Sequence, residues 1–221
     1  MAKSNLLAVH VFGEEIGKLG FDEHRNASFF QYRPEFLKNG QYANLFPFVI
    51  RRVPQPQVFT KYSGETFRSL PPMIADSLPD AFGNMIFKTW HESRHSALHQ
   101  ITVLEQLAYV GRRGMGALEY HPGKDIQSNS TIDIAEMAEI VSKVLRSKAG
   151  ANGDGLDHRS LLNIFKIGSS VGGARAKILV SQEKKTGRIL PGDIASGEDY
   201  DHYLVKLDIK EDIPYSRELV E

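Results

Sequence analysis

The sequence contains no cysteine, which excludes disulfide bonds, thiolate zinc sites and thiol catalysis. No apolar run reaches the length that a membrane-spanning helix needs. The first apolar run is too short for a secretory signal peptide and is followed at once by acidic residues. Lysine plus arginine and aspartate plus glutamate both number 27, so no net charge attracts nucleic acid or a lipid surface. These absences predict a cytoplasmic protein without direct nucleic-acid or membrane partners.

The first third of the chain has the pattern of antiparallel strands. Its 221 residues are enough for one large domain or two small ones. Residues 6–34 alternate strand formers with turn sequences such as Gly-Glu-Glu, and they predict a β-meander. Residues 45–59 are rich in proline, which cannot donate to a strand ladder, so irregular chain or edge strands are expected there.

Two helices are predicted next, one beginning near Leu78 and one beginning at Thr102. The first has Pro79 in its opening turn and an apolar face in the ten residues 81–90. In the second, Thr102 and Glu105 have the spacing of a capping box, and Gly111 is a natural end. The apolar stripe of this second helix comprises Val103, Leu104, Leu107, Ala108 and Val110. Residues 116–122 then predict a short strand and the turn that leaves it.

A third helix and a second group of strands complete the pattern. Ser130 or Thr131 is predicted to cap a helix that ends near Lys148, since apolar residues recur at helical spacing between them. Further strands are predicted near 163–168, 176–182, 188–192 and 202–208, with a hairpin turn at 184–187. The fold class is therefore α+β: an N-terminal β-meander with helices, then a small antiparallel sheet. We divide the chain into residues 1–122, a helical connector with a Gly-rich linker at 123–160, and residues 161–221.

The most informative motif is Ser-Ser-Val-Gly-Gly at 169–173, between two predicted strands. Consecutive glycines let backbone N–H groups approach phosphate oxygens closely. Ala174-Arg175 follow where a Walker A loop needs Lys-Ser or Lys-Thr, and the dinucleotide pattern G-x-G-x-x-G does not occur. A kinase instead combines a Gly-rich loop with a lysine on a later strand, and Lys206 meets that description. The alternative is a plain hairpin turn with a half-exposed strand lysine.

Two further patterns have simpler explanations. His91-Glu92-x-x-His95 matches a zinc-protease helix motif, but Arg94 lies between the two histidines and the segment lacks an apolar stripe. We interpret the segment as a His-rich solvated linker and predict no metal site. The pairs Arg51-Arg52 and Arg112-Arg113 could contact phosphates or a partner protein. Solvated surface is the preferred interpretation, because the balanced charge supplies no wider basic patch.

Five segments together resemble the N-terminal part of the HipA family, serine/threonine kinases that are the toxins of HipBA toxin–antitoxin modules. The similar segments, in chain order, are FFQYRPEFL, SLPDAFGNMIFKTW, LEQLAYVGRRGMGALEYHP, SSVGGARAK and HYLVKLD. They occur in the family's order across nearly the whole chain. The resemblance implies that residues 1–122 are the family's N-terminal subdomain and that residues 161–221 are part of a kinase N-lobe.

The resemblance also implies roles for individual residues. The phosphate-facing loop would comprise Gly172, Gly173, Ala174, Arg175, Ala176 and Lys177. Lys206 would contact the phosphates of ATP, which the family uses with Mg²⁺. Ser170, with Ser169 as an alternative, would be a regulatory autophosphorylation site, where a phosphate would repel the nucleotide.

One departure from the family limits the expected activity. A kinase needs a catalytic Asp, a nearby Asn and a metal-binding Asp after its strand lysine. Only fifteen residues follow Lys206, their only aspartates are Asp208 and Asp212, and no D-x-x-x-x-N pattern occurs. We therefore expect a kinase fragment without catalytic residues, inactive alone and binding ATP weakly or not at all. Its expected partner is a HipB-like DNA-binding antitoxin or its own C-terminal domain, and the full-length family phosphorylates a protein substrate. The alternative is a regulatory module that binds such an antitoxin or a separate kinase subunit.

Overall fold

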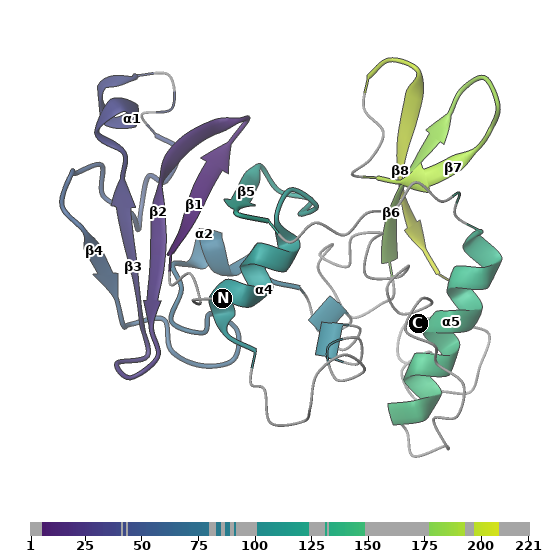
Figure 1. Cartoon of the computed structure of the whole chain (residues 1–221), viewed down its shortest axis with the longest axis horizontal. Coiled ribbons are helices and arrows are strands. Elements are labelled where there is room, and N and C mark those ends of the chain that lie inside the picture. The colour runs from purple at the N-terminus through teal and green to yellow at the C-terminus, as the bar shows by residue number, and fades with distance from the viewer. Residues whose placement is uncertain are drawn as a thin grey trace. The chain divides into compact units, whose positions relative to one another are not determined.

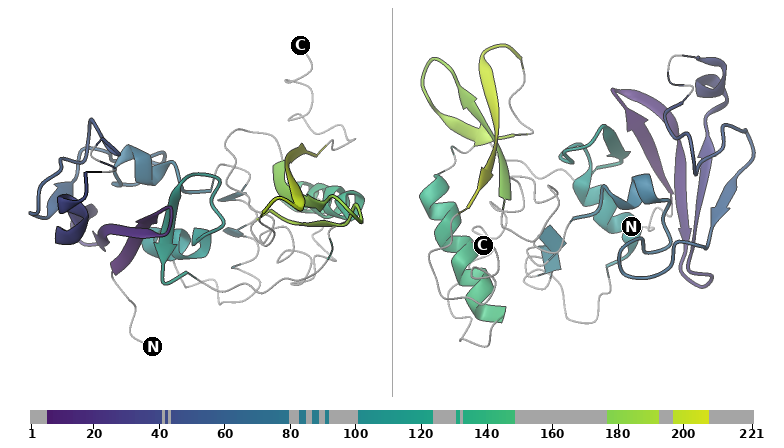
Figure 2. Two further views of the ribbon diagram at one scale, coloured as in Figure 1. Left: turned by 90° about the horizontal axis from the view of Figure 1, so that it is seen from above. Right: turned by 180° about the vertical axis from the view of Figure 1, so that it is seen from behind.

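The chain folds into two compact units, which comprise residues 1–79 with 100–125 and residues 80–99 with 126–221. The computed structural model describes residues 6–40, 42, 44–79, 83–84, 87–88, 91, 101–123, 131, 133–148 (the backbone alone for 144–148), 177–192 and 197–207. Helices and antiparallel sheets occur together in these residues, which confirms the α+β class. Figures 1 and 2 show the elements of each unit.

The first unit contains a five-stranded antiparallel sheet in the order β4-β3-β2-β1-β5. Its strands are β1 (Leu6–Val11), β2 (Glu14–Asp22), β3 (Ala27–Tyr32), β4 (Gln57–Phe59) and β5 (Leu118–His121). The first three strands confirm the predicted meander, and β5 confirms the short strand expected near residue 120. β4 follows the proline-rich segment and is an edge strand, as the proline content predicted.

Three helices accompany this sheet: α1 (Pro34–Lys38), α2 (Pro72–Ala75) and α4 (Val103–Val110). In α4 the Thr102 hydroxyl accepts the Glu105 N–H, and the Glu105 carboxylate accepts the Thr102 N–H, so the predicted capping box is present. Gly111 ends α4 with a φ of 52°, a conformation that favours glycine. All five residues of the predicted apolar stripe are buried. The short helices α1 and α2 were not predicted.

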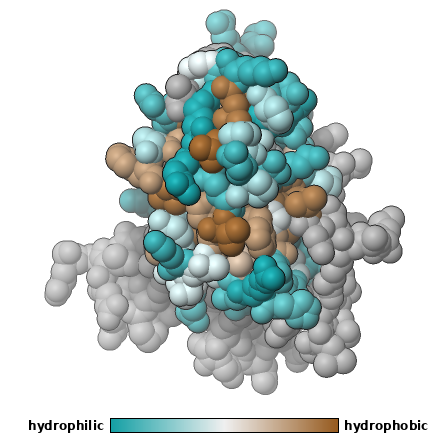
Figure 3. Space-filling model, turned by 90° about the vertical axis from the view of Figure 1, so that its left-hand side faces the viewer, coloured by the Kyte–Doolittle hydropathy of each residue, from teal (hydrophilic) through white to brown (hydrophobic). Residues whose placement is uncertain are grey.

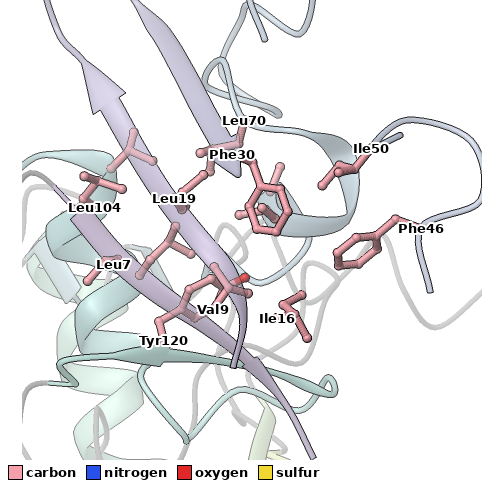
Figure 4. Close-up of a cluster of buried hydrophobic side chains, with 14 of the residues drawn as sticks. Leu7, Val9, Ile16, Leu19, Phe30, Phe46, Ile50, Leu70, Leu104 and Tyr120 are labelled. Atoms are coloured by element: carbon pink, nitrogen blue, oxygen red, sulfur yellow. The ribbon is translucent and has the colours of Figure 1, made fainter. Parts of the chain in front are cut away.

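One face of the sheet and the apolar side of α4 enclose the hydrophobic core (Figure 4). Leu7, Val9 and Val11 alternate along β1 and point to this side. Phe30 and Tyr120 are also completely buried in the cluster. Burial of each such large side chain is worth roughly 1.5–3 kcal/mol, so this core is the main source of stability of the unit.

A bulge and a glycine set the register between β1 and β2. Val9 pairs with Gly17 while His10 pairs with Glu15, which leaves Ile16 as the extra residue of a β-bulge. Ile16 is fully buried in the core. A Cβ at Gly17 would lie 2.3 Å from the backbone oxygen of Gln31 on β3, so only glycine fits there.

Helix α5 (Ile134–Lys148) belongs to the second unit and ends where the sequence predicted. The predicted cap was wrong: Asp133, rather than Ser130 or Thr131, accepts the N–H groups of residues 135 and 136. An aspartate one residue before the helix satisfies these free donors directly and adds a favourable charge at the helix N-terminus. Of the segment predicted to be helical near Leu78, the described residues 83, 84, 87 and 88 are helical, and so is the next described residue, 91. No helix in the described ranges is long and apolar enough to cross a membrane.

The second unit also contains a three-stranded antiparallel sheet in the order β7-β6-β8. Its strands are β6 (Lys177–Glu183), β7 (Ile189–Pro191) and β8 (Tyr200–Lys206), which confirms three of the four strands predicted in this part. The predicted turn at 184–187 joins β6 to β7, with Gly187 at a φ of 72°. The strand predicted at 163–168 lies outside the described residues.

We predict that Gly17→Ala destabilises the protein by about 3 kcal/mol, because the new methyl group overlaps the β3 backbone. Gly40→Ala is the matched control: a Cβ there meets nothing within 4 Å, so its effect should stay below about 0.5 kcal/mol. Urea unfolding measures both variants. Equal unfolding midpoints for the two variants would contradict the close approach of β2 and β3.

Candidate functional site

Two of the predicted site residues, Lys177 and Lys206, lie directly opposite each other in the second unit. Lys177 begins β6, Lys206 ends β8, and the two are paired across the antiparallel ladder. Directly opposed residues share one face of a sheet, with Cβ atoms roughly 4.5–5.5 Å apart. Like charges in this position are unfavourable unless an anionic group lies nearby.

On the face that carries the lysines, the next opposed pair along the ladder is apolar and the pair after it is polar. Leu179 lies opposite Leu204, and Ser181 lies opposite His202. The Ser181 hydroxyl and His202 Nδ1 are 2.8 Å apart, which shows that these side chains occupy the same face. Ser181 is fully buried, so its hydroxyl is a structural partner of His202 rather than an accessible nucleophile. The last pair on this face, Glu183 and Tyr200, places a carboxylate at the end of the ladder away from the lysines.

On the other edge of β6, the residue that follows β7 makes a close backbone contact. The Gly192 N–H donates to the Leu179 carbonyl at 3.1 Å. A Cβ at Gly192 would lie 3.0 Å from the Leu179 Cβ, which is closer than real Cβ atoms normally approach. Glycine at position 192 therefore allows the chain to pass tightly beside Leu179, the residue next to the lysine pair on this face.

The remaining residues of the predicted loop lie outside the described part of the chain. They are Ser169, Ser170, Gly172, Gly173, Ala174, Arg175 and Ala176. The structure thus brings together Lys177 and Lys206 from the predicted set. The roles inferred for the loop remain predictions.

A family model described as the HipA N-terminal domain matches residues 7–121, just over half of the chain. The match begins in β1 and ends at the last residue of β5, so it spans the whole sheet of the first unit. The chain belongs to the HipA family. A comparison with curated proteins found no match.

Within this HipA N-terminal domain, Arg52 has an internal role that the sequence did not predict. Its guanidinium group donates to the carbonyls of Phe36 at 2.8 Å and Leu37 at 3.0 Å, and also to those of Asn39 and Tyr42. Its Cζ atom lies 5.1 Å from the centre of the Phe36 ring. Arg52 therefore donates to carbonyls at the end of α1 and just beyond it. The expectation that it belongs to the solvated surface was wrong.

The other arginines of the two pairs differ from Arg52. Arg51 is exposed, as expected for the surface. Arg112 is also largely exposed and lies 3.6 Å from the Glu119 carboxylate. Arg113 donates to the backbone carbonyl of Tyr109, one turn earlier in α4. The side chains of three of the four residues therefore have specific contacts inside the domain.

The histidine motif of the second unit also differs from the prediction at its one described position. His91 is helical and only 5% exposed, with its ring 6.3 Å from that of Phe87. The interpretation of this residue as part of a solvated linker was therefore wrong. Glu92 and His95 lie outside the described residues. Among those that are described, no group of three His, Cys, Asp or Glu side chains could hold a metal ion.

Buried tyrosines in the HipA N-terminal domain are structural. The Tyr120 hydroxyl donates to the Ser77 hydroxyl at 2.8 Å, and complete burial raises the pKa of Tyr120 well above its ordinary value. Burial likewise raises the pKa of Tyr32 to about 12, against a smaller opposing effect of Arg52. Both phenols stay neutral at physiological pH and provide no acid or base for catalysis.

We predict that Arg52→Met destabilises the protein by about 2–3 kcal/mol, because partly buried carbonyls lose a charged donor. The neighbouring variant Arg51→Met is the control, with an expected change below about 0.5 kcal/mol because that side chain is exposed. Thermal and urea unfolding report the difference. If Arg51→Met were the more damaging change, the assignment of Arg52 as an internal donor would be wrong.

Proposed function

We propose that this chain is the N-terminal part of a HipA-like serine/threonine kinase and carries the phosphate-facing side of its ATP site. The observation that carries the proposal is the opposed pair Lys177 and Lys206 on one face of the β6–β8 ladder. A lysine is a compact point charge suited to phosphate, and two of them on adjacent strands create a local positive potential. The glycine-rich residues 172–176 precede Lys177 directly in the sequence.

The composition of this face suits a nucleotide more than a free phosphate ion. Leu179 and Leu204 lie beside the lysines, and Leu204 is 45% exposed, which leaves apolar surface for an aromatic base. The lysine end of this face suits the anionic part of Mg²⁺–ATP, because the carboxylate of the described pairs on it, that of Glu183, lies at the opposite end of the ladder and contacts Thr186 and Arg188. When bound, ATP would supply the transferable phosphoryl group. The lysines would hold and orient its phosphates.

Transfer of that phosphoryl group needs residues that these 221 positions do not supply. The kinase base and its metal-binding partners would follow Lys206, where no D-x-x-x-x-N pattern occurs. We propose that the chain alone binds nucleotide weakly and catalyses no transfer. Ser170 would regulate the complete enzyme, because a phosphate in the glycine-rich loop would repel those of ATP. A cytoplasmic location is part of the same proposal.

A second function is favoured by the position of the family match. The HipA N-terminal domain covers residues 7–121 and includes a complete hydrophobic core of its own. Such a domain could act as a regulatory module that contacts a HipB-like antitoxin or a separate kinase subunit. Coexpression with neighbouring gene products tests it, and this function predicts a stable, specific complex.

We predict that Lys206→Met weakens binding of Mg²⁺–ATP about tenfold, which corresponds to about 1.4 kcal/mol. Adenosine binding should not change, because adenosine lacks the phosphates. Lys185→Met removes an exposed lysine from the β6–β7 turn and serves as the matched control. Titrations followed by nuclear magnetic resonance can measure such weak binding. Equal ATP affinity of the two variants would contradict the phosphate-facing role of Lys206.

We also predict no phosphoryl transfer by the purified chain, either to itself or to added protein, in the presence of Mg²⁺ and radiolabelled ATP. The physical reason is that no base or metal-binding aspartate in kinase spacing follows Lys206. Magnesium-dependent autophosphorylation above the level of a Lys206→Met control would show that the chain is catalytically complete.

A further inference from the structure

A groove runs beside the edge strand β4 of the first unit and has no role in the proposed nucleotide site. It has a volume of about 620 Å³ and is lined by residues from two stretches, 48–53 and 55–62. Figure 3 shows this side of the molecule, where hydrophobic side chains are exposed among hydrophilic ones. The groove therefore lies between an edge strand and accessible apolar side chains.

The backbone of β4 has one open edge. β4 pairs with β3 through residues 57–59 and is the last strand of its sheet. In the part of the chain that the structure describes, its backbone is hydrogen-bonded to β3 alone. An unpaired strand edge offers a row of N–H and C=O groups that an extended peptide can join.

Two apolar side chains at the groove are unusually exposed. Phe48 is 93% exposed, and Val58, in the middle of β4, is 57% exposed. Phe59, the residue after Val58, is buried in the core, so the alternation along β4 directs Val58 outward. Exposed apolar groups that border a groove are typical of interaction sites.

The charged side chains that line the groove favour acidic partners over basic ones. Arg51 and Lys61 are the charged residues of its lining, and no acidic residue contributes to it. Both side chains are exposed. A partner that carries acidic side chains would gain favourable electrostatic interactions, whereas a basic partner would be repelled.

Specific hydrogen bonds join the two stretches that line the groove. The Gln57 side chain accepts the Arg51 N–H and donates to the Arg51 carbonyl, both at 2.7 Å. These two bonds fix the stretch that contains Arg51 relative to β4. A preformed site loses less conformational entropy when it binds a ligand.

We propose that this groove binds an extended peptide segment with alternating acidic and apolar residues, which adds to the sheet as a strand beside β4. The peptide backbone would pair with β4, its apolar side chains would contact Phe48 and Val58, and its carboxylates would meet Arg51 and Lys61. A peptide is favoured over single-stranded nucleic acid, because the open strand edge needs a backbone partner and Phe48 is the one strongly exposed aromatic ring in the lining.

The test uses the full chain and a fluorescein-labelled heptapeptide, Glu-Val-Glu-Phe-Glu-Val-Glu, with blocked termini. Fluorescence anisotropy should show saturable binding. The double variant Arg51→Glu/Lys61→Glu should weaken binding at least tenfold, and so should Phe48→Ser. The control Arg25→Glu/Lys185→Glu makes the same change in net charge in two exposed turns and should alter affinity less than twofold. Unfolding midpoints verify that each variant is folded.

Two altered peptides distinguish the contribution of the peptide's charge from that of backbone pairing. Replacing every glutamate by lysine should weaken binding at least tenfold, and so should N-methylation at alternate residues, which blocks strand pairing. The proposal is overturned if the parent peptide shows no saturable binding, or if the charge-reversed groove binds it equally well. Tighter binding of an oligothymidylate that depends on Arg51 and Lys61 would also overturn it and assign the groove to single-stranded nucleic acid.

Discussion

Antiparallel strand register is the constraint on which both units depend. Side chains alternate between the two faces of a strand, so a slip of one residue would move a whole set to the opposite face. In the first unit, the bulge at Ile16 and the close approach at Gly17 fix β1, β2 and β3 so that one face supplies the core. In the second unit, the β6–β8 register brings Lys177 opposite Lys206. A slip of β8 by one residue would separate these two lysines.

The two units differ in the extent of their cores and in the surfaces that they expose. The HipA N-terminal domain has an extensive core, a satisfied capping box and an arginine that closes the end of α1. These features make it a stable body with an open edge at β4. The second sheet is small and half exposed along β8, where Tyr203 and Leu204 retain nearly half of their exposure. Such a surface is suited to ligand binding more than to independent stability.

Local signals in the sequence were sufficient for much of the fold. Thr102 and Gly111 flank the short helix α4 and Glu105 lies in its first turn, so their spacing alone predicted both ends of the helix. The cap of α5 was harder to predict, because Ser130, Thr131 and Asp133 all have side chains that can accept backbone N–H groups. The role of Arg52 could not be foreseen, since it depends on α1, a five-residue helix without a periodic pattern.

In the candidate site, too, some features could be predicted from neighbouring residues in the sequence, whereas others depend on contacts between residues far apart. The strand around Lys206 follows from its apolar neighbours. Its pairing with Lys177 follows only from the register, which links residues far apart in the sequence. The groove beside β4 has no short motif at all. It arises because Gln57 holds a separate stretch beside the edge strand.

The central claim, that the paired lysines face nucleotide phosphates, is tested most directly by nuclear magnetic resonance of the lysine side chains. Titration of the ¹³C-lysine-labelled chain with Mg²⁺–ATP should shift the ε-carbon signals of Lys177 and Lys206 together, at a common affinity. Adenosine should leave both signals unchanged, and Lys185 should not respond to either ligand. Equal shifts with ATP and adenosine, or no shift at either lysine, would contradict the account.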